Sequence, residues 1–226
     1  MKHFLVYHVE ILRAIPPKDS PRLETIEYCD GWHDFAGMGI SVIGFFDSAY
    51  PATYQIALGF DTDALNDFEA LASERVVIGF NSRGFHDKVM GAHGYSIHSD
   101  FDLLHEVRLA SGQPPTYERG VTRAGYSLDA LAWSNLDEGK ISKGDVAPID
   151  WQQGRKSKVI NYVLHDIYLT HELLTLWMAR GFLNDPSPQR VGDLLGHECV
   201  SPEFADFLRF CAHHMSPLPR WLNNRK

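Results

Sequence analysis

The chain has 226 residues and a formal net charge of −8, with 44% hydrophobic and 22% charged residues. This composition is ordinary for a globular protein with one well-filled core, and it indicates a single α/β domain with a helical extension rather than a fibrous or disordered chain. The negative charge argues against broad, non-specific binding to nucleic acid through a basic surface. It does not exclude a nuclease, because divalent metals and a few local cations can supply a positive field.

The cysteine pattern and the hydrophobic runs indicate where the protein resides. An odd number of cysteines without C-x-x-C spacing favours free thiols in a reducing cytoplasm over a disulfide framework or a zinc ribbon; they are Cys29, Cys199 and Cys211. The first apolar run carries His8 and Glu10 within it, which predicts a buried strand rather than a signal peptide. Apolar runs stay well short of the roughly 20 residues that a membrane helix needs, so we expect a cytoplasmic protein that does not span a membrane.

The chain order of the predicted elements indicates a mixed sheet with helices packed on it. Apolar, β-branched runs bounded by Pro, Gly and Ser predict strands at residues 4–12, 39–47, 52–58, 75–80 and 95–97. Apolar positions at helical spacing, several of them behind a capping Asp or Ser, predict helices at residues 61–72, 88–90, 102–109, 127–133, 157–179, 190–196 and 201–214. We expect residues 137–155 to form a loop.

Three short segments carry ionisable residues at places where a site can form. His8 and Glu10 are two residues apart on the first predicted strand, so both side chains point to the same face, where burial is costly without a metal or hydrogen bonds. Asn81 follows the strand at 75–80, the usual position of binding residues in open α/β sheets, and His86 comes five residues later. Each has an ordinary alternative: a solvent-facing strand end, a hydrogen-bonded core histidine or a plain strand-to-helix loop.

The third segment lies on the longest predicted helix. Tyr162 and Asp166 are one helical turn apart and share a face, and His165 flanks it. The phenol could orient a phosphate or an attacking water while Asp166 holds a metal. A core tyrosine beside a surface aspartate is the alternative.

In order, type and spacing, these segments resemble the three motifs of the DEDD-type 3′–5′ exonucleases, in the branch with Tyr in the third motif. Those motifs normally read Asp-x-Glu, Asn-x-x-x-Phe-Asp and Tyr-x-x-x-Asp. Here His8 and His86 stand where the first two aspartates would be. The resemblance covers roughly residues 4 to 175, is closest in character to predicted exonuclease-like domains of phage and bacteria, and is supported by further segments at Asp102-Leu103-Leu104, 125–132, Lys140 and 147–152.

The resemblance implies a ribonuclease H-like fold and a divalent-metal site. It implies an exonuclease-like domain at residues 1–181 and a helical extension at 182–226 packed on it. The implied metal ligands are His8, Glu10, His86 and Asp166, and the implied catalytic residues are Glu10, Tyr162 and Asp166. Two-metal phosphodiester hydrolysis normally uses Mg²⁺ or Mn²⁺ on carboxylate oxygens. The two imidazoles favour a transition metal such as Mn²⁺, Co²⁺, Ni²⁺ or Zn²⁺, and Asp87 could replace His86 if the loop shifts.

The expected substrate contacts are Asn81, Arg83 and Lys156. Further candidate phosphate contacts, which could equally form a solvated basic loop, are Lys88, Lys140, Lys143, Arg155 and Lys158. Two aromatic residues, Phe85 and Trp151, could stack on a terminal base or belong to the core.

Together these features predict a metal-dependent 3′–5′ exonuclease that hydrolyses phosphodiester bonds at the 3′ end of single-stranded DNA or RNA. Activity should fall as the pH drops through about 6.5, because an imidazole must be neutral to bind a metal. One alternative is a degenerate exonuclease domain that binds nucleic acid or a protein without cutting. A metalloenzyme acting on a small molecule is the other. The nuclease interpretation requires His8 and Asp166 to lie within about a dozen ångströms of each other.

Overall fold

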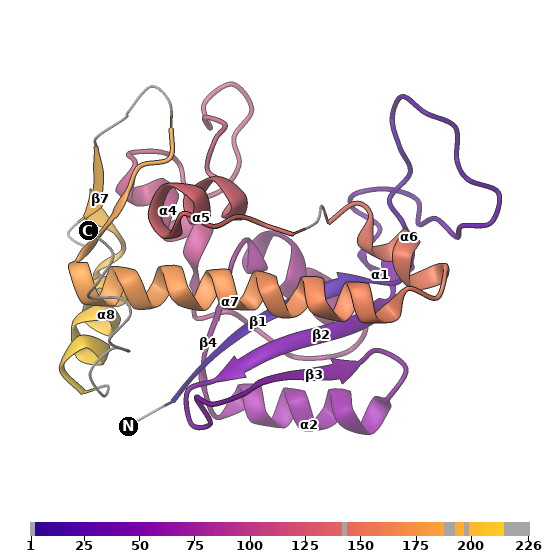
Figure 1. The fold of residues 1–226 in the computed structure, drawn as a ribbon, viewed down its shortest axis with the longest axis horizontal. Helices are drawn as coiled ribbons and strands as arrows, with labels where there is room; N and C mark the ends of the chain where they lie inside the picture. Colours follow the sequence, from indigo (N-terminus) through magenta and orange to yellow (C-terminus); the bar gives the residue numbers. More distant parts are fainter. Residues whose placement is uncertain (1–2, 142–143, 188–192, 197–198, 215–226) are drawn as a thin grey trace. The chain divides into compact units, whose positions relative to one another are not determined.

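The computed structural model describes residues 3–141, 144–187, 193–196 and 199–214. Their central feature is a five-stranded sheet in the order β3-β2-β1-β4-β5 (Figure 1). The strands are β1 (Phe4–Ile11), β2 (Ile40–Asp47), β3 (Tyr54–Leu58), β4 (Val76–Gly79) and β5 (Phe101–Asp102).

The sheet is mixed because its connections differ along the chain. β1, β2 and β3 pair antiparallel in chain order, with a long segment that contains the short helix α1 (Phe35–Met38) between β1 and β2. β4 returns after helix α2 (Thr62–Ser73) and pairs parallel with β1. β5 pairs parallel with β4. The predicted fold class is therefore confirmed: an α/β chain with a ribonuclease H-like mixed sheet flanked by helices.

The two faces of β1 have different roles. Tyr7 packs against Phe68 of α2 with ring centroids 5.8 Å apart, in the main apolar cluster. His8 points to the opposite face, where it pairs in register with Gly44 of β2. Helix α7 (Lys156–Arg180) packs closely on this face. A Cβ added to Gly44 would lie only 2.4 Å from Cδ1 of Ile167. The alternation of β1 thus aims His8 and Glu10 at α7.

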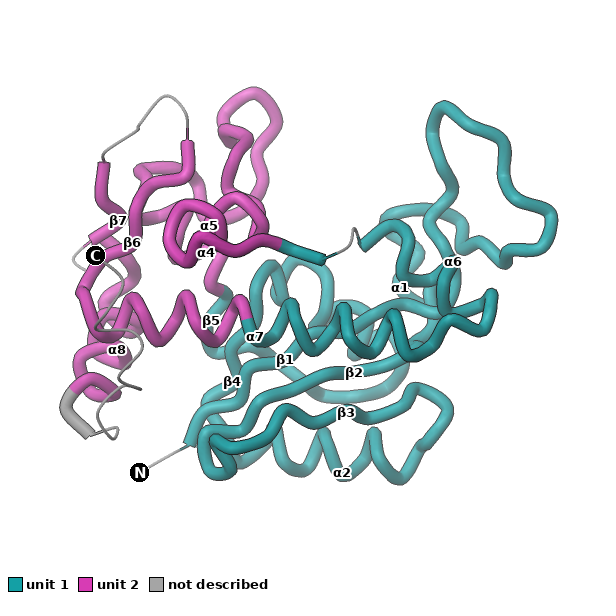
Figure 2. The backbone as a smooth tube through the Cα atoms, viewed as in Figure 1, with its two compact units in different colours: residues 1–102, 140–168 teal, residues 103–139, 169–226 magenta. Residues whose placement is uncertain are grey.

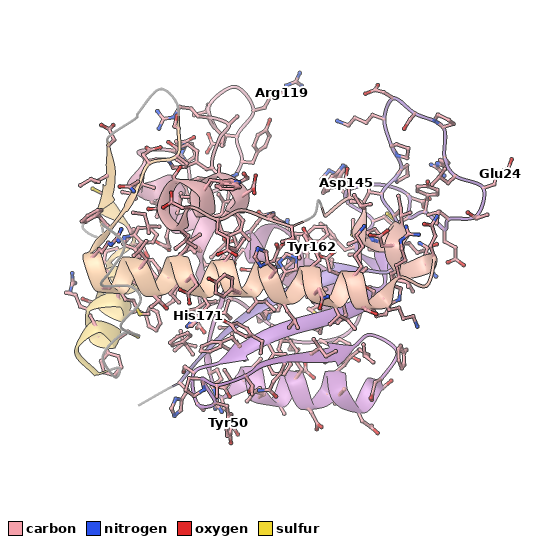
Figure 3. All side chains as sticks on the ribbon, viewed as in Figure 1. Glu24, Tyr50, Arg119, Asp145, Tyr162 and His171 are labelled. Atoms are coloured by element: carbon pink, nitrogen blue, oxygen red, sulfur yellow. The ribbon has the colours of Figure 1, made fainter. Side chains whose placement is uncertain are left out.

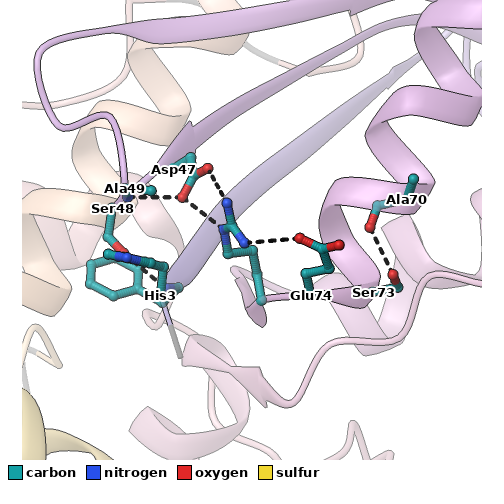
Figure 4. A network of polar contacts seen from close by, with 9 residues as sticks. His3, Asp47, Ser48, Ala49, Ala70, Ser73 and Glu74 are labelled. Atoms are coloured by element: carbon teal, nitrogen blue, oxygen red, sulfur yellow. Dashed lines mark hydrogen bonds and ion pairs between the residues drawn. The ribbon is translucent and has the colours of Figure 1, made fainter. Parts of the chain in front are cut away.

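At the end of the sheet where β2 finishes, a buried ion pair stabilises the structure. Asp47, at the end of β2, is buried and accepts two hydrogen bonds of 3.1 Å from Arg75, which directly precedes β4 (Figure 4). The Asp47 carboxylate also accepts a hydrogen bond from the backbone N–H of Ala49. A paired, bidentate carboxylate of this kind offsets the cost of its burial.

Two predicted elements are wrong for reasons of tertiary structure. Residues 95–97 are not a strand: Ile97 is buried in the core, and the N–H of Ser96 donates to the Glu69 carboxylate instead of to a neighbouring strand. The alternating pattern there reflects core packing, and the fifth strand is β5. The loop predicted at 137–155 contains helix α6 (Ala147–Gln152), which starts with Pro148 in its first turn.

The helix predicted at residues 190–196 is also wrong where the structure describes it. Residues 190–192 lie outside the described residues. Leu194–Gly196 form strand β7, which pairs antiparallel with β6 (Phe182–Asn184). Pairing with β6 decides the conformation here, and a helical spacing of apolar residues cannot show it.

The chain divides into two compact units (Figure 2). The first, residues 1–102 and 140–168, holds the five-stranded sheet with α1 (Phe35–Met38), α2, the π-helix η1 (Ser82–His86), α3 (Asp87–Ala92), α6 and the first half of α7. The second, residues 103–139 and 169–226, holds α4 (Leu103–Ala110), α5 (Leu128–Leu136), β6, β7, α8 (Pro202–His214) and the second half of α7. The domain boundary expected at residue 181 stays a prediction.

Within the second unit, α8 packs on the end of α7. The rings of Trp177 and Phe204 meet edge to face with centroids 5.6 Å apart, and both side chains are buried. The hydroxyl of Tyr126 donates to the carboxylate of Asp185, which ties the segment before α5 to the residue after β6. None of the described helices combines the length and the apolar character needed to cross a membrane.

Candidate metal centre

β1 places His8 and Glu10 side by side on the face toward α7. Nε2 of His8 lies 3.0 Å from Oε1 of Glu10. The His8 side chain is 16% exposed and that of Glu10 is 5% exposed, so the pair opens to solvent only through the imidazole. Burial raises the pKa of Glu10 above its usual value, although the contact with His8 opposes the shift. A carboxylate in this position gains from any cation that approaches it.

α7 brings Asp166 to the same point. Its carboxylate is fully buried, and Oδ2 lies 3.8 Å from Nε2 of His8. One ligand atom each from His8, Glu10 and Asp166 lie within 4.8 Å of one another. The structure therefore brings together three of the four predicted metal ligands, from residues more than 150 positions apart in the chain.

His86 lies beside this group rather than within it. Its ring centroid is 4.2 Å from that of His8, and the ring is buried at the end of η1. Its Nδ1 has no hydrogen-bond partner among the described residues. Burial, together with the nearby His8 and Lys140, holds the pKa of His86 well below its usual value, so the ring is neutral at physiological pH.

The turn before η1 is fixed by a single buried carboxylate. Asp102 accepts hydrogen bonds from the backbone N–H groups of Asn81 (2.8 Å) and Arg83 (3.1 Å). Asn81 is exposed in the left-handed region, with φ 56°, a conformation that asparagine adopts more readily than most residues. The Arg83 guanidinium donates to the backbone carbonyls of Ser99 and Asp100. These contacts hold the loop that carries His86.

Asp87 does not replace His86 in this arrangement. Its carboxylate accepts hydrogen bonds from the Tyr7 hydroxyl and from both the N–H and the hydroxyl of Ser99, each of the latter at 2.9 Å. Tyr7 lies on the other face of β1, so Asp87 belongs to the structural support of η1 and α3 rather than to the cluster around Asp166.

Lys140 also belongs to the cluster, although the motifs did not predict it as a partner of Asp166. Its Nζ lies 2.6 Å from Oδ2 of Asp166 and 4.8 Å from the centroid of the Tyr162 ring. Tyr162 is buried on α7 one turn before Asp166 (Figure 3). Burial and the negative charge of Asp166 raise the pKa of Tyr162 well above its usual value, so the phenol stays protonated. The sequence indicated Lys140 only as a phosphate contact.

The comparisons with known proteins support the fold and leave the activity open. No family model matches this sequence, and no curated protein does. Among solved structures, the chain is similar to the family B DNA polymerase from the hyperthermophilic archaeon Pyrobaculum calidifontis, with 15% identity and a TM-score of 0.50. The match covers 79% of this chain and 25% of that one, so the chain spans about a quarter of the polymerase's length.

Most of the other predicted substrate residues have partners in the structure. Lys158 and Arg155 both pair with the buried carboxylate of Asp150, at 2.7 Å from Lys158 Nζ and 2.7 Å from Arg155 Nε. Lys156 lies over the rings of Trp151 and Phe60 at 5.2 and 5.6 Å.

The remaining predicted contacts divide between core and surface. Trp151 is buried, and Phe85 is half-buried against the main apolar cluster. Lys88 lies over the ring of Phe35, and Lys143 lies outside the described residues.

The donor set fits a divalent cation. One imidazole nitrogen and two carboxylates suit transition metals and Mn²⁺ better than they suit Mg²⁺, which prefers oxygen ligands throughout. Glu10 and Asp166 are buried beside His8, and Asp166 also pairs with Lys140. A bound metal would lower the cost of burying two like charges. The cluster can therefore hold a metal ion, and a metal held there would polarise a phosphate or a water molecule.

Proposed function

We propose that this protein is a metal-dependent phosphodiester hydrolase that removes nucleotides from the 3′ end of single-stranded nucleic acid. The observation that carries the proposal is the convergence of His8, Glu10 and Asp166 from β1 and α7 within 4.8 Å. The fold, which is shared with a DNA polymerase, supports nucleic acid as the substrate class. The order and spacing of the three motif segments support the direction of cutting.

His8, Glu10 and Asp166 would hold the metal, which when bound supplies Lewis-acid polarisation and a more acidic water molecule. In the reaction, the oxygen of a water molecule forms a bond to phosphorus while the bond from phosphorus to the 3′ oxygen of the preceding nucleotide breaks. The proton lost by the water ends on that 3′ oxygen. Tyr162, whose phenol stays protonated, can donate a hydrogen bond to a phosphate oxygen or to the water.

Substrate positioning is assigned to the residues around the turn before η1 and the start of α7. Asn81 is exposed next to the loop that carries His86, and its amide can contact a sugar or a base. Arg83 is exposed, and its guanidinium is already oriented by two backbone carbonyls. Lys156 lies over two aromatic rings, which fixes its ammonium on the surface of the same unit.

The test is degradation of single-stranded DNA and RNA, labelled at the 5′ or at the 3′ end, with Mg²⁺, Mn²⁺, Co²⁺, Ni²⁺ and Zn²⁺ in parallel. We expect 3′-labelled strands to release labelled mononucleotide first and 5′-labelled strands to shorten stepwise. Asp166→Asn, purified in the same way, is the control for contaminating nuclease and should lose at least about a hundredfold in rate. Equal rates for the two proteins, or no cleavage with any metal, would contradict the proposal.

A second candidate function is favoured by the Lys140–Asp166 ion pair and by the two histidines at aspartate positions. These features lower the negative charge available to metals, as expected of a domain that binds nucleic acid without cutting it. In that case the double variant His8→Asp/His86→Asp should gain Mg²⁺-dependent cleavage that the native chain lacks. If the native chain cleaves as fast as the double variant, this second function is wrong.

A further inference from the structure

We propose that the Lys140 ammonium takes the place of the second cation in this site, so that the cluster of His8, Glu10 and Asp166 binds a single divalent ion. The inference rests on the proposed function, and it assigns Lys140 to the site as a fixed positive charge beside the single bound ion. It differs from the two-metal arrangement that the resemblance implies.

One carboxylate oxygen of Asp166 already has a positive charge beside it. Its Oδ2 is approached by Nζ of Lys140 at 2.6 Å and by Nε2 of His8 at 3.8 Å. In a two-cation site the ions lie about 4 Å apart, so a second ion at this cluster would have to lie close to the ammonium. Here one side of Asp166 is already taken by an ammonium, and a divalent ion on that side would meet a positive charge at ion-pair distance.

The charges of the site also balance with one divalent ion and not with two. Glu10 and Asp166 contribute two negative charges, and Lys140 contributes one positive charge. One divalent ion and one phosphodiester bring the total to zero, whereas two divalent ions leave two positive charges uncompensated in a largely buried site.

The position of Lys140 is fixed by contacts within the site. The side chain is 21% exposed, and its Nζ lies 4.8 Å from the centroid of the Tyr162 ring. Tyr162 and Asp166 share one face of α7, so the ring and the carboxylate hold the ammonium from two directions. An ammonium fixed in this way can stabilise the negative charge that develops on the phosphate oxygens.

The experiment is a titration of the full chain with Mn²⁺, followed by calorimetry and by electron paramagnetic resonance, which distinguishes isolated from coupled Mn²⁺ ions. We expect the native chain and Lys140→Arg to bind one ion without spin coupling. Lys140→Met should bind two coupled ions, the first at least about tenfold more tightly than in the native chain, because a positive charge has been removed beside it. Asp166→Asn should bind none.

The outcomes separate the inference from the proposed function. If the native chain binds two coupled ions, or if Lys140→Met binds one ion with unchanged affinity, the inference is overturned and the nuclease proposal stands. If the native chain binds no Mn²⁺, both are overturned. Should Lys140→Met fail to fold by circular dichroism, Lys140→Gln is titrated in its place, with the same expected second ion.

Discussion

Glu10 on β1 and Asp166 on α7 are both buried carboxylates. At the level of single residues, a buried carboxylate that favours metal binding costs folding stability when no metal is bound. Glu10 is buried, and burial raises its pKa, so its ionised form destabilises the metal-free fold. Asp166 is compensated by the Lys140 ammonium at 2.6 Å. Glu10 is therefore the residue at which the cost of the site should be measurable.

Replacing Glu10 with Gln should make the metal-free protein more stable at pH 7.5 by about 1 kcal/mol, because a buried charge is removed and the volume is kept. The folded pKa of Glu10 is raised, so its ionised form costs stability above that pKa. This cost disappears as the pH falls to the ordinary glutamate value, and the two proteins should converge there. Thermal unfolding at pH 7.5 and pH 4, with and without Mn²⁺, measures this.

The variant should also lose the rise in melting temperature that Mn²⁺ gives the native chain. Glu27→Gln is the matched control, since Glu27 is exposed and pairs only with Arg13 among the ion pairs described. It should leave both quantities unchanged. A metal-free Glu10→Gln protein that melts below the native chain at pH 7.5 would show that the carboxylate is stabilised by contacts other than a metal.

At the scale of elements, the site depends on how closely α7 approaches β2. Gly44 lies opposite His8 in the sheet, and an added Cβ would meet Ile167 Cδ1 at 2.4 Å and Val163 Cγ2 at 3.2 Å. A glycine in a strand interior usually marks such a close approach. The missing side chain lets Asp166 come within reach of His8.

Gly44→Val should therefore push α7 away from the sheet. We expect a loss of about 1–3 kcal/mol in unfolding free energy from overpacking, together with weaker Mn²⁺ binding, because the ligands come from both elements. Chemical denaturation and Mn²⁺ titration measure the two effects. Ile167→Ala in the same chain should restore part of both.

Gly91→Ala is the matched control for that experiment. Gly91 lies in α3, and an added Cβ there would meet nothing within 4 Å. The substitution should stabilise the protein by about 0.5–1 kcal/mol, as expected for glycine in a helix. A Gly44→Val protein as stable as Gly91→Ala would mean that α7 does not rest on β2 at this point.

The elements also show what the sequence could and could not predict. β1, β2 and β4 were predictable because each is a nearly unbroken apolar run, and α7 because its apolar residues recur at helical spacing. β5 and β7 are only two and three residues long, and each depends on pairing with another strand rather than on its own pattern. The convergence of His8 and Asp166 followed from the motif resemblance. The pairing of Lys140 with Asp166 had no local signal, because Lys140 lies outside any helix or strand and its partner is on α7.

At the scale of the whole molecule, two histidines with lowered pKa values, the buried His86 and the half-buried His171, make stability depend on pH. Burial lowers the pKa of His171 to about 4, and it outweighs the Glu172 carboxylate, 3.7 Å from Nδ1. The pKa of His86 is also held well below its usual value by burial. Both groups take up protons more readily in the unfolded chain, where the histidine pKa is about 6.5. Their contribution is therefore complete above about pH 6.5 and is lost as the pH falls below it.

The unfolding free energy should decrease steadily from pH 7 to pH 4, and His171 alone should account for up to about 3 kcal/mol of the loss. His171→Gln should flatten this slope, and His86→Gln should flatten it further, because each removes one group that the unfolded chain protonates preferentially. Glu10 acts in the opposite direction, so the slope is best measured in the Glu10→Gln background. Urea denaturation at half-unit steps of pH gives the curve. A slope that His171→Gln leaves unchanged would mean that this imidazole accepts a proton in the folded chain as easily as in water.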